Sequence, residues 1–234
     1  MKKLLICASI VSVLAAVANA QNANITWGTP TTISISNDVS TVGTLLGTWA
    51  PYDGSAPFTV NGVTFTSGDI PGLSTTLNNG GGVGTYASPG TLDANYNTLL
   101  TAAAFGNNGG PFTISWGGMT VGDTYLVQLW VNDARNIGGL RTETFTGGAN
   151  TSAILDYGSN PNGTGPGQFI TGTFVADAAS QNISILATGY APSAQFNLLQ
   201  VRDITPVPEP STLAVLATGA GALLFGFRRK NRAV

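Results

Sequence analysis

Hydrophobic and polar residues alternate along most of this chain, a pattern typical of strands that bury one face of a sheet. The alternation is clearest in residues 123–131, where Tyr125, Val127 and Leu129 face one way while Gln128 and Trp130 face the other. We predict further strands at residues 25–36, 57–67, 112–116, 140–146, 151–157, 168–176, 182–188 and 195–202. Within residues 57–67, the pair Asn61-Gly62 separates two short apolar runs, which predicts a two-residue type I′ hairpin turn.

Residues 92–105 have a helical period instead. Apolar residues recur there at spacings of three and four from Leu92 to Ala103, which places them on one face of a helix. Asp93 lies in the first turn and Gly106 follows the last. We therefore predict one helix over residues 92–105, packed over one end or edge of the sheets.

The order of these elements predicts an all-β fold class. Glycine-rich segments separate about nine or ten short strands at regular spacing, which favours an antiparallel two-sheet β-sandwich. The single early helix, together with a last strand at residues 195–202 that is apolar on both sides, favours a jelly roll.

The first 20 residues depart from the strand pattern. Lys2 and Lys3 precede an apolar run at residues 4–18, and Ala18-Asn19-Ala20 has the small-x-small form of a cleavage site. We predict a secretory signal peptide at residues 1–20, recognised by the export machinery and cleaved after Ala20. The body of the protein is then an ectodomain at residues 21–206.

The last 28 residues, 207–234, also depart from it. Residues 212–227 are sixteen uncharged residues, which as a helix span roughly 24 Å, and an arginine-rich segment follows them. This predicts a transmembrane helix at residues 212–227 with its basic end in the cytoplasm. Pro208 and Pro210 favour an extended segment just before that helix.

Residues 207–234 resemble the PEP-CTERM sorting signal of exported bacterial proteins in their order of Pro-Glu-Pro, apolar run and arginine cluster. The resemblance implies that an exosortase recognises Pro208, Glu209 and Pro210, removes the helix and passes the body to the cell surface. It further implies a Gram-negative bacterium, with the body anchored outside the inner membrane until processing and then at the cell surface or extracellular. The alternative is an ordinary C-terminal anchor that is never cut.

Composition narrows what the body can do. Residues 21–206 contain three arginines and ten acidic residues, which leaves a net charge of −7, and they contain no lysine, histidine or cysteine. Such a body repels nucleic acid, so we expect no nucleic-acid partner. It also lacks the side chains of a Ser-His-Asp triad, a cysteine nucleophile or a conventional zinc site. A carboxylate pair remains for a glycosidase, with Glu143 as one member; the alternative is an ion pair of Glu143 with Arg141 or Arg135.

One group of polar residues predicts a ligand site. Asp133 and Arg135 follow the strand at residues 123–131, and Arg141 begins the next, so all three are expected near one hairpin loop. In sugar-binding jelly rolls, which the predicted fold resembles, polar side chains on such loops bind sugar hydroxyls while an aromatic ring stacks on the sugar. Trp130 is our candidate for that ring, with Trp49 or Tyr157 as alternatives. The competing interpretation is a local ion pair of Asp133 with Arg135, or of Glu143 with Arg141.

Three segments resemble strands of galactose-binding-like and malectin-like jelly rolls: GDTYLVQLWVND at residues 122–133, GQFITGTF at 167–174 and FNLLQVR at 196–202. The resemblance implies the same sandwich and is compatible with carbohydrate binding. It transfers no binding residue, because no loop motif matches position by position.

Oxygen-bearing side chains in the loop that starts at Asp156 suggest a structural calcium ion, with Asp156, Asn160 and Asn162 as ligands. The alternative is an ordinary Gly/Asn/Pro turn. We expect no other cofactor.

Three interpretations of function follow, in order of preference. The first is an exported, non-catalytic protein of the cell surface or extracellular matrix whose ectodomain binds carbohydrate, with a surface polysaccharide as partner. The second is a purely structural or adhesive surface module. A carboxylate-dependent enzyme acting on glycosides is the third.

Overall fold

A computed structural model describes residues 22–51, 57–66, 70–91 and 93–206. The predicted signal peptide with Ala20, the Pro208-Glu209-Pro210 motif and the predicted helix at residues 212–227 all lie outside the described residues. No helix among the residues that the structure describes has the length and apolar character needed to cross a membrane.

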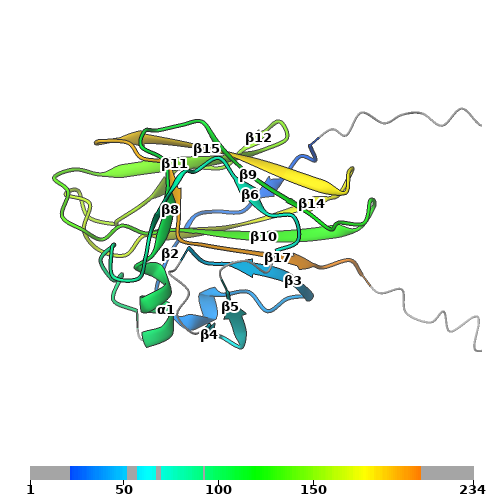
Figure 1. The fold of residues 1–234 in the computed structure, drawn as a ribbon, viewed down its shortest axis with the longest axis horizontal. Coiled ribbons are helices and arrows are strands. Elements are labelled where there is room, and N and C mark those ends of the chain that lie inside the picture. The colour runs from blue at the N-terminus through cyan, green and yellow to red at the C-terminus, as the bar shows by residue number, and fades with distance from the viewer. Residues whose placement is uncertain (1–21, 52–56, 67–69, 92, 207–234) are drawn as a thin grey trace, which may run out of the picture.

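Two antiparallel six-stranded sheets make up most of the described chain (Figure 1). In the first sheet the strand order is β1-β14-β10-β17-β3, with β2 beside β14; in the second it is β12-β11-β15-β9-β6, with β13 beside β11. The first sheet comprises β1 (Thr26–Trp27), β2 (Thr31–Thr32), β3 (Thr44–Trp49), β10 (Thr124–Val131), β14 (Gln168–Val175) and β17 (Leu198–Asp203). The second comprises β6 (Ser74–Thr75), β9 (Phe112–Gly117), β11 (Arg141–Gly147), β12 (Asn150–Thr151), β13 (Leu155–Asp156) and β15 (Ser180–Gly189).

The long strands alternate between the sheets along the chain. β9, β11 and β15 lie in the second sheet, whereas β10, β14 and β17 lie in the first, so each connection crosses from one sheet to the other. This winding is that of a jelly roll, and it confirms the predicted antiparallel β-sandwich.

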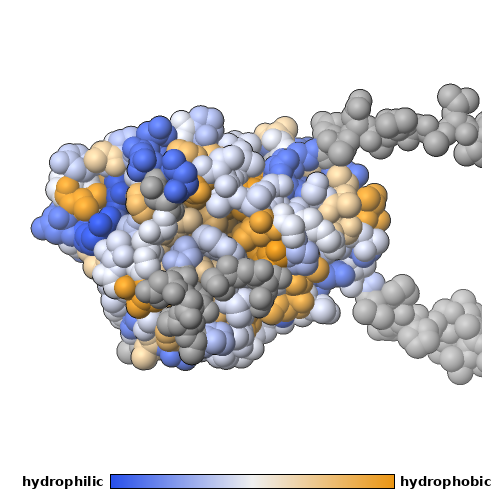
Figure 2. All heavy atoms as spheres, in the orientation of Figure 1, coloured by the Kyte–Doolittle hydropathy of each residue, from blue (hydrophilic) through white to orange (hydrophobic). Residues whose placement is uncertain are grey.

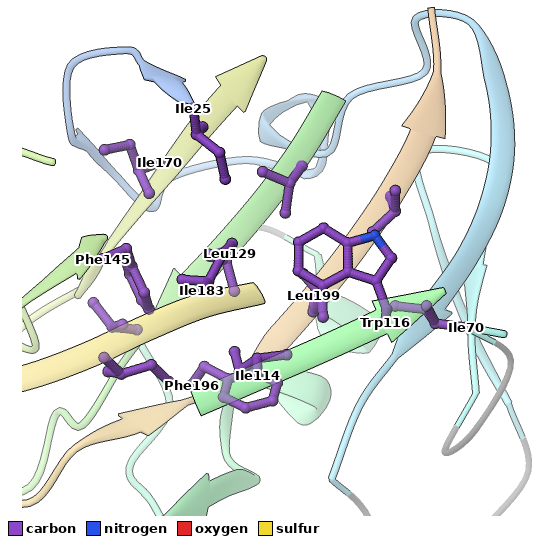
Figure 3. Close-up of a cluster of buried hydrophobic side chains, with 14 of the residues drawn as sticks. Ile25, Ile70, Ile114, Trp116, Leu129, Phe145, Ile170, Ile183, Phe196 and Leu199 are labelled. Carbon is purple, nitrogen blue, oxygen red and sulfur yellow. The ribbon is translucent and has the colours of Figure 1, made fainter. Parts of the chain in front are cut away.

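The main core lies between the two sheets. Leu129, Ile170 and Leu199 of the first sheet point toward Ile114 and Ile183 of the second, and all five are buried (Figure 3). Each such side chain contributes about 1.5–3 kcal/mol when it leaves water. Because the body contains no cysteine, burial of this kind takes the place of disulfides in holding the sandwich together.

A second core covers the outer face of the first sheet. It is formed by the helix α1 (Ala94–Leu100) and the hairpin of β4 (Phe58–Val60) and β5 (Val63–Phe65). The hairpin is as predicted, since Asn61 and Gly62 adopt positive φ angles of 48° and 72° as a type I′ turn requires. Central strand β10 is consequently buried on both faces.

The predicted helix at residues 92–105 is too long. The helix ends at Leu100, and residues 103–105 form strand β8 (Ala103–Phe105), which pairs with β7 (Asn79–Gly81) and β16 (Gln195–Phe196). The reason is a distant side chain: Asn197 Nδ2 donates to the carbonyl oxygens of Leu100 (3.0 Å) and Ala102 (2.7 Å). Carbonyls satisfied in this way need no continuation of the helix.

Four strand predictions also need correction; one is residues 195–202, which divide into β16 and β17 in different sheets. Residues 25–36 form only β1 and β2, because Asp38 Oδ2 accepts the N–H groups of Ser34 (2.6 Å) and Ile35 (3.1 Å) and bends the chain into the 3-10 helix Ser36–Asp38. Residues 151–157 are split into β12 and β13, since Ser152 Oγ accepts from Phe145 N–H (3.0 Å) between them. Residues 44–49, where the alternation predicts no strand, form the edge strand β3.

Asp93 begins helix α1 by accepting the N–H of Tyr96 (2.9 Å), and this cap yields a prediction. We expect Asp93→Ala to lower the free energy of unfolding by about 1 kcal/mol, because one helical N–H loses its partner. The melting temperature followed by circular dichroism should fall by about 2–4 °C for a body of this size. Asp177→Ala, at an exposed turn position, serves as control, and an equal melting temperature for both variants would contradict the capping role.

Candidate functional site

The predicted site lies at one end of the sandwich, which we call the loop end. It is formed by residues 132–140, 158–167 and 190–194, on the left of Figure 1. Figure 2 shows strongly hydrophilic residues gathered at this end. Strand β10 ends there at Val131, and Asp133 N–H donates to the carbonyl of Tyr157 (2.8 Å), which ties the β10 end to the loop after β13.

Asp133 lies between two guanidinium groups. Arg135 donates through Nε to Oδ1 and through Nη2 to Oδ2, both at 2.7 Å, and Arg141 pairs with the same Oδ2. Asp133 is only 1% exposed. The structure therefore brings Asp133, Arg135 and Arg141 together as predicted, and the interpretation as a local Asp133–Arg135 ion pair is confirmed.

The two arginines differ in exposure. The side chain of Arg135 is 43% exposed and lies 4.5 Å from the centre of the Tyr86 ring. Arg141 is buried, 5.0 Å from the centre of the Tyr157 ring, and burial lowers its pKa. Of the four candidate ligand-binding residues, only Arg135 presents its charged group to solvent.

Trp130 needs correction as a candidate sugar platform. It is 0% exposed and belongs to the second core, where its Nε1 donates to the Tyr96 hydroxyl (2.6 Å) and the Phe65 ring meets it edge-on at 5.9 Å. Tyr157, one of the alternatives for that ring, is also buried. Trp130 contributes to stability here, because its ring and its N–H are both satisfied inside the protein.

Glu143 is enclosed beside this cluster on strand β11. It is 0% exposed, it contacts the Tyr157 hydroxyl, and its Oε2 accepts from Gln195 N–H (3.2 Å). Burial raises the pKa of Glu143 to about 8, an effect that its hydrogen-bonding neighbours Tyr157 and Gln195 and the charge of Arg141 only partly offset. Its Oε1 has no hydrogen-bond partner among the described residues. The predicted Glu143–Arg141 pair is wrong, because Arg141 pairs with Asp133 instead.

The hydrogen bonds around Tyr157 can accommodate a proton on Glu143. The Tyr157 hydroxyl has one hydrogen to donate. Its oxygen lies 2.9 Å from the carbonyl oxygen of Ser193, which can only accept. Donation to that carbonyl leaves the Tyr157 oxygen free to accept from a protonated Glu143. A general acid must be within reach of its substrate. The carboxyl of Glu143 instead contacts Tyr157 and Gln195 inside the protein and has no contact with solvent.

Of the predicted calcium ligands, Asn160 and Asn162 are held within their own loop. Asn162 Oδ1 accepts from the Thr164 hydroxyl (2.8 Å), and Asn160 Nδ2 donates to that same hydroxyl (3.0 Å). Asp156 is partly buried on β13, and burial raises its pKa. Among the described residues, no group of three or more His, Cys, Asp or Glu side chains is placed to hold a metal. The loop has the form of the Gly/Asn turn considered above, and the calcium ion stays a prediction.

Sequence reasoning missed the tyrosine beneath Arg135. Tyr86 lies in a glycine-rich loop with no periodic pattern, and only the folded chain brings its ring to Arg135. Only the composition pointed to such a contact: residues 21–206 contain three arginines, and each is expected to have a partner.

Comparison with known proteins classifies the tail. The sandwich itself defines an all-β jelly roll with a buried charge cluster at its loop end. Residues 206–230 match the family model of the PEP-CTERM protein-sorting motif. The chain carries this motif and is thus an exported protein sorted by an exosortase system. No curated protein and no solved structure matches the chain, so the resemblance to galactose-binding-like and malectin-like jelly rolls stays a prediction.

Proposed function

We propose that the sandwich is a non-catalytic module of the cell surface or extracellular matrix, displayed with its loop end pointing away from the sorting tail. The observation that carries this proposal is the position of the two ends of the described chain. Asn22 hydrogen-bonds to Asn182 at the start of β15 (2.8 Å), and Ile204 N–H donates to Thr124 at the start of β10 (2.9 Å). Both therefore lie at the end opposite the loop end, on the right of Figure 1.

Enzymatic activity has less support. A glycosidase needs two carboxyl groups that face a substrate across a cleft. Glu143 is enclosed with Tyr157, and Asp133 is covered by Arg135 and Arg141. These groups instead stabilise the loop end through ion pairs and hydrogen bonds inside the protein.

Binding of a surface polysaccharide is the second candidate function. It is favoured by a depression beside Trp27 on the side of the sandwich. It is not favoured by the loop end, where the rings of Trp130, Tyr157 and Tyr86 are buried.

The sorting route provides a test of the display proposal. We expect replacement of Pro208-Glu209-Pro210 by Ala-Gln-Ala to leave the body in the membrane fraction with its tail attached, because the processing enzyme loses its recognition sequence. Cell fractionation and immunodetection of the body on intact cells measure this outcome, with Asp177→Asn as control for expression. Equal surface exposure of the altered and parent proteins would contradict the proposed route.

A further inference from the structure

One side of the sandwich carries a depression that the loop-end site does not include. The short strands β1 and β12 meet there, one from each sheet. The depression has a volume of about 410 Å³, and its lining includes Thr26, Trp27, Gly28, Asn150 and Thr151. That volume lies within the range of small-ligand sites, about 300–1,000 Å³.

The indole of Trp27 is held in one orientation. Its Nε1 donates to the carbonyl of Asn150 (3.2 Å), which joins the two sheets across the depression. Its six-membered ring lies over Gly172 of β14, where an added Cβ would come within 2.7 Å of Cε3. Asn150 is fixed in turn, since its Nδ2 donates to the carbonyl of Ile25 (3.1 Å). The site is therefore formed before any ligand arrives, which lowers the entropic cost of binding.

The chemistry of the lining selects a class of ligand. Trp27 is partly exposed and offers an apolar ring, while Thr26 and Thr151 are exposed residues of the same lining, and the Thr151 hydroxyl shares a hydrogen bond with that of Thr146 (2.9 Å). None of the described residues that line the depression carries a charge. The body carries a net charge of −7, so an anionic polymer is repelled as it approaches. An aromatic ring with neutral hydrogen-bonding groups suits a ligand that has both apolar C–H faces and hydroxyls.

We infer that the Trp27 depression is a binding site for a neutral saccharide, with the sugar ring against the indole and the hydroxyls near Thr26 and Thr151. This inference rests on the second candidate function, binding of a surface polysaccharide. It places the binding site on the side of the sandwich rather than at Arg135. A long polymer can run along this side while the chain stays attached through its tail.

The test uses the full chain in a zwitterionic detergent without a sugar headgroup, titrated with neutral hexasaccharides of glucose, xylose and mannose. Calorimetry should show saturable binding of at least one of them. We expect Trp27→Ala to weaken that binding about tenfold or more, because it removes the apolar surface. Arg135→Ala, at the loop end, should bind as the parent does.

A second variant guards against loss of folding in Trp27→Ala. Thr26→Lys adds a bulky charge at an exposed lining position and should abolish binding without changing the melting temperature. Parent-like binding by both Trp27→Ala and Thr26→Lys would overturn the site. If Arg135→Ala alone lost binding, the polysaccharide function would stand and this site would fail. Absence of binding to every hexasaccharide would overturn both.

Discussion

Asp133→Ala is expected to lower the free energy of unfolding by about 3–5 kcal/mol, the usual cost of breaking a buried ion pair from one side. The substitution leaves the guanidinium of Arg141 buried without a counter-charge, because the neighbouring Glu143 is held protonated. Denaturation in urea, followed by tryptophan fluorescence, measures the loss.

The two arginines give a matched control for this result. Arg135→Ala removes a partner of the same carboxylate, but one that is 43% exposed, so we expect a loss of no more than about 1 kcal/mol. The double variant Asp133→Asn, Arg141→Met leaves no unpaired buried charge and should be more stable than Asp133→Ala. An equal decrease in the free energy of unfolding for Asp133→Ala and Arg135→Ala would show that the buried charge of Arg141 does not determine the size of the effect.

The second large effect is a dependence of stability on pH through Glu143. Its pKa is about 8 in the folded protein and 4.5 as its ordinary value, so the folded state holds a proton that the unfolded state has lost between these values. Because the folded state binds the extra proton, the contribution of Glu143 to the free energy of unfolding is complete below pH 4.5. It declines by up to about 1.4 kcal/mol per pH unit as the pH rises towards 8. The groups that face Glu143 are Arg141 on its own strand, Tyr157 after β13 and the backbone of Gln195.

Glu143→Gln isolates this effect. Glutamine keeps the shape and can donate to the Tyr157 hydroxyl, but it does not titrate, so its melting temperature should change less between pH 5 and pH 8 than that of the parent. We expect the variant to be the more stable of the two at pH 8.5. Asp177→Asn, at an exposed position, serves as the control for removing a carboxylate. A parent and a Glu143→Gln curve that run parallel would contradict the enclosed, protonated carboxyl.

Strands with a strict alternation could be predicted from the sequence within a few residues. β10 and β14 follow that pattern because one face of each lies on the main core. β3 was missed because Leu45 and Leu46 are adjacent and Gly47 interrupts the pattern. The end of α1 was missed for a different reason, since the side chain that satisfies its carbonyls comes from Asn197, far along the chain.

The sequence predicts which residues come together at the site, but not which of them are buried. Asp133, Arg135 and Arg141 meet because they flank the connection between β10 and β11, which follow each other in the sequence; this connection crosses between the sheets and is not the predicted hairpin loop. The burial of Trp130 cannot be predicted from the sequence. The elements that cover it, β5 and α1, are distant in sequence, and no local pattern shows that they pack on it. The Trp27 depression was missed because it needs the edges of two sheets to meet, and no local pattern records that.

The position of the chain ends gives the display proposal a physical basis. A body attached through residue 206 presents the loop end and the side of the sandwich to its surroundings, while the end that carries both chain ends faces the membrane or the final anchor. The described cores are packed from apolar side chains, and the body contains no cysteine that could form a disulfide.

The mass of the mature protein collected from the cell surface or medium tests the central claim most directly. We predict an N-terminus at Gln21 and a C-terminus that precedes Thr212, the ends expected if export and sorting remove both predicted hydrophobic segments. Recovery of the protein from the cytosol with residues 1–20 and 212–234 still attached would contradict the account.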